Sequence, residues 1–237
     1  MDGNLWLAVA LGVLFLWPKR AQAQAQGPIE LINDTAPIQP DAVSNPDAVP
    51  VTSDRRVFEM TLPVDINAFL YMIRACEHRF PNDVTNDACY GLFYGGQRFE
   101  DMSDHPVMTG ELAPVPLPEA MCKAAGLKSP CFSTAAGAYQ FIRPTWARLR
   151  DKLDLPDFDV DSQDRAAFEL LKESGAYDAI KDRDIEGAIR KSSNIWASLP
   201  GNSYQQNPKA MAYALDRFRE GQVLYATTSR VEPPPLP

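Results

Sequence analysis

Residues 65–77 read DINAFLYMIRACE, and this stretch determines how the rest of the chain is interpreted. Asp65 can cap a helix because its side chain can accept a hydrogen bond from a backbone N–H of the first turn. Apolar residues then recur at the spacing of one helical face, namely Ile66, Phe69, Leu70 and Ile73. The pattern predicts an amphipathic helix at the start of the folded part of the chain.

Glu77 is the candidate catalytic residue of this helix. It follows Ile73 by four residues and Leu70 by seven, so it lies on the apolar face at the C-terminal end. Partial desolvation and the negative end of the helix dipole both raise the pKa of a carboxyl group there. A raised pKa suits a general acid near neutral pH. The alternative is a solvated glutamate on a frayed last turn.

The pattern of residues 61–226 as a whole is mostly helical. Further helix starts are indicated by two prolines suited to a first turn and two capping side chains: Pro144, Pro208, Ser162 and Asp184. We expect the helix from Pro144 to run to about Leu153 and the last helix to end near Gly221. Residues 90–99 are predicted to form two short strands around Gly95 and Gly96, and residues 106–130 a Pro-rich loop. The predicted fold class is therefore α+β, mostly helical with a small β-hairpin lobe.

The composition limits the possible partners. The chain has 237 residues, 45% hydrophobic and 23% charged, which is ordinary for a globular protein. Its 31 acidic and 23 basic side chains give a net charge of −8, so we expect no nucleic-acid partner. The two histidines are not spaced as metal ligands, and no metal or cofactor is expected.

The N-terminal region is predicted to be separate from the folded domain. Residues 5–17 (LWLAVALGVLFLW) are uniformly apolar but would span only about 20 Å as a helix, against about 30 Å of hydrocarbon. We expect residues 1–25 to be an export signal or a membrane anchor. Residues 26–60 are predicted to be a disordered, Pro-rich linker, and residues 227–237 a Pro-rich tail.

All four cysteines lie in the predicted folded domain. An even number after an export-like segment favours two disulfides over four buried thiols. Three pairings are possible, and we expect Cys76–Cys89 and Cys122–Cys131 because each closes a short loop.

Two further segments carry candidate substrate-binding residues. Residues 133–146 (STAAGAYQFIRPTW) combine small residues with Tyr139 and Gln140, and residues 192–206 (SSNIWASLPGNSYQQ) place Tyr204 on a loop. Aromatic rings and amides suit sugars, which present C–H faces and hydroxyl edges. Taken alone, the first segment fits a tightly packed helix start better, and Trp196 in the second is expected to be core.

From about residue 66 to residue 220, the sequence resembles the phage lambda-type endolysins, which are lytic transglycosylases with a lysozyme-like fold. The resemblance lies in four segments in the family's order: YGLFYGGQRFEDMSDHP, STAAGAYQF, DFDVDSQDRAAFELLKESGA and SNIWASLPG. It implies cleavage of the β-1,4 bond between N-acetylmuramic acid and N-acetylglucosamine in peptidoglycan. We expect a monomer that needs no cofactor, located in the host periplasm, at the membrane or in the virion. Glu77 matches the catalytic glutamate. The substrate cleft would be lined by residues 90–104 with Tyr90, and by Ser133, Tyr139, Gln140 and Tyr204.

The sequence departs from this family in three places. His78 follows the glutamate where glycine is usual, the loop at residues 107–132 is longer and carries two cysteines, and the N-terminal apolar segment is additional. His78 could alter the pKa or the pairing of Glu77.

A hydrolase normally uses a second carboxylate. The spacing of T4-type lysozymes leads from Glu77 to Asn86 and Leu92, so their pattern is absent. Other candidates for a second carboxylate are Asp83, Asp87, Asp101 and Asp104, of which Asp104 is expected to cap a loop. A single carboxylate predicts a transglycosylase that forms 1,6-anhydromuramic acid. The alternatives are a T4-type hydrolase, a non-catalytic peptidoglycan-binding or virion structural protein, and a bacterial wall-remodelling transglycosylase of a secretion system.

Overall fold

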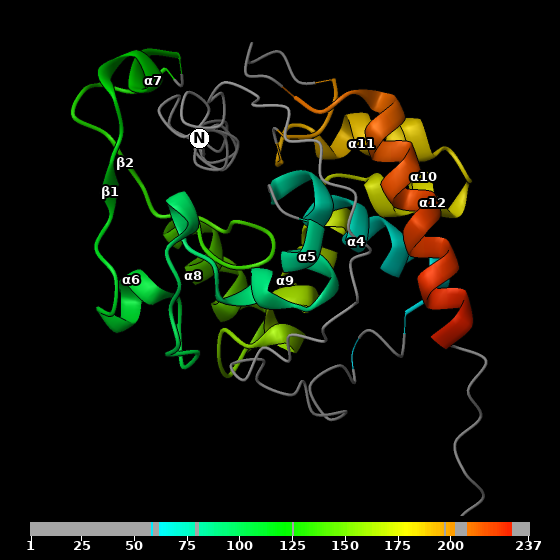
Figure 1. Ribbon diagram of the computed structural model, residues 1–237, viewed down its shortest axis with the longest axis horizontal. Helices are drawn as coiled ribbons and strands as arrows, with labels where there is room; N and C mark the ends of the chain where they lie inside the picture. The colour runs from blue at the N-terminus through cyan, green and yellow to red at the C-terminus, as the bar shows by residue number, and fades with distance from the viewer. Residues whose placement is uncertain are drawn as a thin grey trace, which may run out of the picture.

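The computed structural model describes Phe58 and residues 62–78, 81–124, 126–196, 198–201 and 208–228. Helix α4 lies inside the helical body and packs lengthwise against α12 (Figure 1). The elements are α4 (Val64–Glu77), α5 (Pro81–Thr85), η2 (Ala88–Gly91), η3 (Tyr94–Gly96), α6 (Pro106–Thr109), β1 (Val115–Pro116), α7 (Glu119–Ala124), β2 (Phe132–Ser133), α8 (Arg143–Leu153), α9 (Val160–Glu173), α10 (Ala176–Lys181), α11 (Ile185–Ser192) and α12 (Met211–Thr228).

Helix α4 is buried on every side. Its N-cap is Pro63, and Asp65 lies within the first turn rather than at the cap. All residues from Ile66 to Glu77 are buried, including the polar Asn67 and Arg74. The expected amphipathic helix is therefore a central helix, because α12 and α9 cover faces that the sequence pattern left open to solvent.

The other predicted helix starts agree with the structure to within a few residues. Pro144 lies in the first turn of α8, and the Asp184 side chain caps α11 by accepting from the Gly187 N–H at 2.9 Å. Helix α9 begins before Ser162, because Asp159 is its N-cap and Ser162 donates instead to Asp157. These differences leave the helical order of the domain as predicted.

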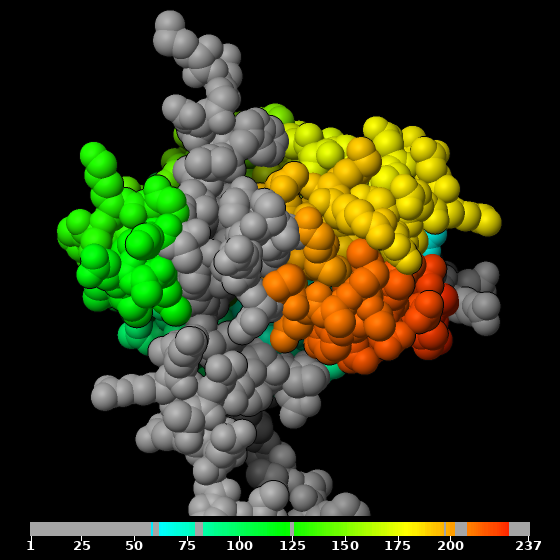
Figure 2. All heavy atoms as spheres, turned by 90° about the horizontal axis from the view of Figure 1, so that it is seen from above, coloured from blue at the N-terminus to red at the C-terminus, as the bar shows by residue number. Residues whose placement is uncertain are grey.

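The strands lie outside the segment where they were predicted. Within residues 90–99 there is an isolated antiparallel bridge between Leu92 and Arg98, and the turn between them is the 3₁₀ helix η3. The two-stranded antiparallel sheet pairs β1 with β2, in register Val115 with Ser133. These strands and α7 form a long extension, on the opposite side of the molecule from α11 and α12 (Figure 2). Residues 106–130, expected to be irregular, therefore supply one strand and two short helices.

A buried polar cluster connects distant parts of the chain. One guanidinium nitrogen of Arg74 donates to the hydroxyls of Tyr90 at 2.9 Å and Tyr139 at 2.7 Å, and the other to Tyr225 at 2.8 Å. Both Tyr90 and Tyr139 donate in turn to Asp164 of α9, at 2.7 and 2.5 Å. The cluster fixes α4 one turn before Glu77.

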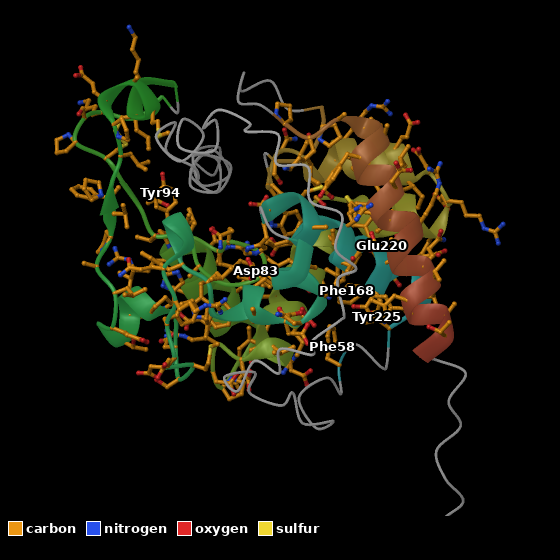
Figure 3. The ribbon with its side chains drawn as sticks, viewed as in Figure 1. Phe58, Asp83, Tyr94, Phe168, Glu220 and Tyr225 are labelled. Carbon is orange, nitrogen blue, oxygen red and sulfur yellow. A yellow bond between two sulfur atoms is a disulfide. The ribbon has the colours of Figure 1, made fainter. Side chains whose placement is uncertain are left out.

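The predicted N-terminal segment, most of the linker and most of the tail lie outside the described residues. Phe58 is an exception within the predicted linker: its ring packs on Phe168 of α9 with centroids 5.8 Å apart, and its N–H donates to Asp161 (Figure 3). Helix α12 continues to Thr228, past the expected boundary at residue 226. Among the described helices, none has the length and apolar character needed to cross a membrane.

Candidate active site

Glu77 ends helix α4 and is 5% exposed. Its Oε1 accepts a hydrogen bond of 2.5 Å from the hydroxyl of Ser198, whereas its buried Oε2 has no hydrogen-bond partner among the described residues. Burial raises the pKa of Glu77 to about 8, although the Ser198 hydrogen bond and the positive charge of Lys209 act in the opposite direction. Glu77 therefore holds its proton near neutral pH, as a general acid must.

A small, open recess lies beside Glu77. Its lining comes from the end of α4, from the turn at residues 92–96 and from the loop before α8: Glu77, His78, Leu92, Phe93, Gly95, Gly96 and Gln140. Gly95 and Gly96 both adopt positive φ, which favours glycine, and both are exposed. The turn predicted from these glycines therefore forms one wall of the recess.

His78 is neutral at the pH where Glu77 is protonated. Burial lowers the pKa of His78 to about 4, and its Nε2 lies 2.9 Å from the carbonyl oxygen of Ala138. Since a carbonyl only accepts, Nε2 carries the proton and donates it. His78 is not among the groups that shift the pKa of Glu77. The replacement of the family's glycine by His78 therefore adds a wall to the recess without adding a charge.

Gln140 is the predicted substrate-binding residue that the structure brings to the recess. Its amide nitrogen donates to the carbonyls of Gly137 at 2.9 Å and Leu92 at 3.3 Å, which fixes the side chain. Its backbone has φ of 49°, in the left-handed region. The two donated hydrogen bonds leave the amide oxygen as the group that can accept from a ligand.

Three other predicted substrate-binding residues are not at the recess, which corrects the sequence interpretation. Tyr90, Tyr139 and Ser133 are 2%, 0% and 1% exposed. The two tyrosine hydroxyls belong to the buried cluster around Arg74, and the Ser133 hydroxyl accepts from the N–H of Ala135. Tyr204 lies outside the described residues.

One of the two predicted disulfides is present. Cys122 and Cys131 are bonded, with Cα atoms 5.8 Å apart, and close the extension beyond β1 and β2. The predicted Cys76–Cys89 bond is not formed, and both residues are buried thiols. Cys76 lies on the side of α4 that faces α12, where Lys209 and Arg217 act on its thiol, and burial raises its pKa to about 12. Cys76 and Cys89 both belong to the main core, and the short loop between them did not imply a bond.

Three of the four other candidate carboxylates are engaged elsewhere. Asp83 lies 3.7 Å from a guanidinium nitrogen of Arg98, and Asp101 accepts from Ser103 within its own loop. Asp104 caps its own loop by accepting from the His105 N–H at 2.8 Å, as expected. It also accepts from the Trp146 indole at 2.7 Å and from Arg150 at 2.5 Å, which ties that loop to α8.

Glu77 is the single carboxylate among the described residues that border the recess. The undescribed segments at residues 79–80, 125, 197 and 202–207 contain no aspartate or glutamate, whereas residues 59–61 include Glu59. The described residues also include no group of three or more side chains arranged to hold a metal ion.

The sequence did not identify Ser198 or Lys209 as functional residues. Ser198 lies in the segment SNIWASLPG, which was noted only for its resemblance to the family. Ser198 is 121 residues from Glu77, and its position depends on Trp196, whose indole donates to the Tyr139 carbonyl at 3.1 Å. A hydroxyl residue in a loop just after a buried tryptophan was the available signal. It does not reveal which side chain the hydroxyl meets.

The folded part of the chain is similar to known proteins. A family model described as Endolysin matches residues 67–223. The endolysin of Escherichia phage P2 is 38% identical over 152 residues, which cover 62% of this chain and 86% of that protein. The endolysin of Escherichia phage lambda is 38% identical over 136 residues, which cover 57% of this chain and 77% of that protein. The structure of phage lambda lysozyme in complex with a chitohexasaccharide is 33% identical with a TM-score of 0.54, and covers 68% of this chain and 95% of that one.

Proposed function

We propose that this chain, which belongs to the endolysin family, cleaves the β-1,4 bond between N-acetylmuramic acid and N-acetylglucosamine in bacterial peptidoglycan by lytic transglycosylation. One observation carries the choice of reaction: Glu77 is the single carboxylate among the described residues at the recess, and burial raises its pKa to about 8. The saccharide in the complex of the lambda lysozyme supports a glycan as ligand.

The reaction follows from the two oxygens of Glu77. Because Ser198 occupies Oε1, the proton resides on Oε2 and passes from there to the glycosidic oxygen. The bond from C1 to that oxygen breaks and leaves an oxocarbenium-like centre on the muramyl sugar. The C6 hydroxyl of the same sugar attacks C1, and Oε2 accepts the proton that this hydroxyl releases. The product is 1,6-anhydromuramic acid, no water is consumed, and Glu77 regains its proton.

The intramolecular attack removes the need for a second carboxylate. A hydrolase must activate water or form a covalent glycosyl intermediate, and both routes use a second acidic group. The C6 hydroxyl is already part of the reacting sugar, so proximity replaces that group. A T4-type hydrolase is therefore the less favoured reading. A non-catalytic binding module is also disfavoured. The buried Oε2 of Glu77 has no hydrogen-bond partner among the described residues, which lowers the stability of the fold, and a binding module has no use for such an acid.

We also propose that the enzyme acts as a monomer outside the cytoplasm, in host lysis. The disulfide between Cys122 and Cys131 fits an oxidising compartment. Residues 5–17 supply an export signal or an anchor in this proposal. Mass analysis of purified virions would distinguish the related possibility of a virion-borne enzyme that penetrates the wall.

The decisive variant is Glu77→Gln, which keeps the shape of the side chain and removes its acid. We expect clearance of purified peptidoglycan to fall by orders of magnitude with the fold intact. Glu186→Gln is the matched control, because Glu186 is exposed and pairs with Arg190, and it should retain full activity. Unchanged activity of Glu77→Gln would reject the assignment of the acid.

A further inference from the structure

A single carboxyl that serves as acid and then as base must be stable in both protonation states. The buried position of Glu77 favours the protonated state and penalises the anion that forms after proton transfer. Building on the function proposed above, we infer that Ser198 and Lys209 are positioning residues for this cycle. The Ser198 hydroxyl directs the proton to Oε2, and the Lys209 ammonium stabilises the carboxylate without pairing with it.

Ser198 lies directly against Glu77. Its hydroxyl oxygen lies 2.5 Å from Oε1, and it can donate to that oxygen whether Oε2 is protonated or not. The neighbouring Trp196 and Leu199 are fully buried or nearly so, and the Trp196 indole is bonded to the Tyr139 carbonyl. The donor therefore needs no rearrangement when Glu77 loses its proton, which is the requirement for electrostatic preorganisation.

Lys209 is positioned through the same loop. Its backbone N–H donates to the carbonyl of Ser198 at 2.8 Å, and its ammonium lies 5.4 Å from the centre of the Tyr213 ring. The Tyr213 hydroxyl donates to the carbonyl of Ala75 near the end of α4. These contacts hold a positive charge beside the C-terminal end of α4, where it also complements the helix dipole.

The separation of Lys209 from Glu77 matters for the acid step. The ion pairs seen among the described residues do not join Lys209 to Glu77, yet the positive charge of Lys209 lowers the pKa of Glu77. A direct ion pair would ionise Glu77 and remove the acid, whereas a charge at longer range stabilises the anion only in part. The adjacent Cys76 thiol and His78 ring are both neutral near pH 7, and Arg217 of α12 acts on Cys76 rather than on Glu77.

The experiment measures kcat/KM against pH for the full-length chain on soluble peptidoglycan fragments. The alkaline limb of this profile reports the ionisation of Glu77 in the free enzyme, because only the protonated form can act as the acid. Ser198→Ala and Lys209→Met each remove a group that stabilises the anion. We expect each to move the alkaline limb upward by about half to one pH unit, with kcat lowered about tenfold for Ser198→Ala.

Three variants separate this role from a loss of packing. Ser198→Thr keeps the hydroxyl and should restore the wild-type limb. Ser193→Ala removes a buried hydroxyl that donates to the Arg190 carbonyl, and Lys181→Met removes a lysine that lies 5.2 Å from the Tyr177 ring. Both controls should leave the limb in place, because neither group acts on Glu77.

The outcomes distinguish the two proposals. If Glu77→Gln is inactive but the alkaline limbs of folded Ser198→Ala and Lys209→Met match the wild type, the inference is wrong and the assignment of the acid stands. If Glu77→Gln keeps its activity, the proposed function fails, and the inference fails with it. Should Ser198→Ala not fold, the alkaline limb of Lys209→Met alone decides the inference.

Discussion

At the scale of single residues, Glu77 carries a burial cost that the rest of the domain offsets. Its carboxyl is 5% exposed and receives one hydrogen bond, from Ser198. The pKa of the group therefore rises from an ordinary value of 4.5 to about 8 in the folded chain. Since the folded state binds the proton more tightly than the unfolded state, Glu77 links stability to pH.

The sign of this linkage gives a prediction for Glu77→Gln. The stability contribution of the protonated carboxyl is fully present below about pH 4.5 and is lost as pH rises through about 8. Glutamine does not titrate, so the variant should become more stable than the wild type by a few kcal/mol between these limits. Urea unfolding at several pH values measures the difference. A constant difference across the range would contradict the burial of the acid.

At this scale the sequence predicted Glu77 correctly as a member of a buried helical face, but not its surroundings. Tyr90 and Tyr139 were expected in a cleft because aromatic residues near small residues suit sugars. They are buried because Arg74 and Asp164, which are 90 residues apart, engage their hydroxyls. Helical spacing identifies a face, but it does not identify a partner from a distant segment.

At the scale of elements, the contact between α4 and α12 determines where the acid lies. Gly221 of α12 approaches Ala68 of α4 so closely that an added Cβ would lie 2.8 Å from the Ala68 Cα. The sequence interpretation placed the end of the last helix near this glycine. The helix instead continues to Thr228, because the glycine serves a close approach of two helices and not a helix end.

Gly221→Ala tests this reading. Alanine ordinarily stabilises the middle of a helix by about 1 kcal/mol relative to glycine. Here the obstructing atoms are backbone, so α12 must shift, and we expect a net destabilisation of about 1–3 kcal/mol. Chemical denaturation measures the change in the free energy of unfolding. A stabilised variant would show that the two helices can separate at this point without cost.

Helix positions were predicted more accurately than strands, and for a physical reason. Asp184 caps α11 through a hydrogen bond within its own first turn, so the signal is local. The pairing of Val115 with Ser133 joins segments separated by an insertion with its own helix and disulfide. Such pairing depends on tertiary context, and a Pro-rich sequence carries little sign of it.

At the scale of the whole molecule, the cluster around Arg74 joins α4, α9 and α12 in one buried site. Its members are almost fully buried, with Arg74 at 1% and Asp164 at 0% exposure. Tyr225 reaches the cluster from the far end of α12 (Figure 3). The cluster therefore anchors α4, the helix that carries Glu77, to both α9 and α12.

Asp164→Asn should destabilise the whole domain. The substitution leaves the Arg74 charge buried without its counter-charge, and the expected cost is about 3–5 kcal/mol. Asp178→Asn is the control, because Asp178 pairs with Lys181 at the exposed surface, and it should change stability by less than about 1 kcal/mol. Equal effects of the two variants in thermal unfolding would contradict the importance of the cluster.

The central claim is that one carboxyl breaks the glycan without a second acidic partner. Mass spectrometry of the fragments released from purified peptidoglycan tests it most directly. We predict that the new ends carry 1,6-anhydromuramic acid, without the mass of an added water molecule, and that Glu77→Gln releases none of them. Reducing muramic acid ends that carry an added water would contradict the account and indicate a hydrolase.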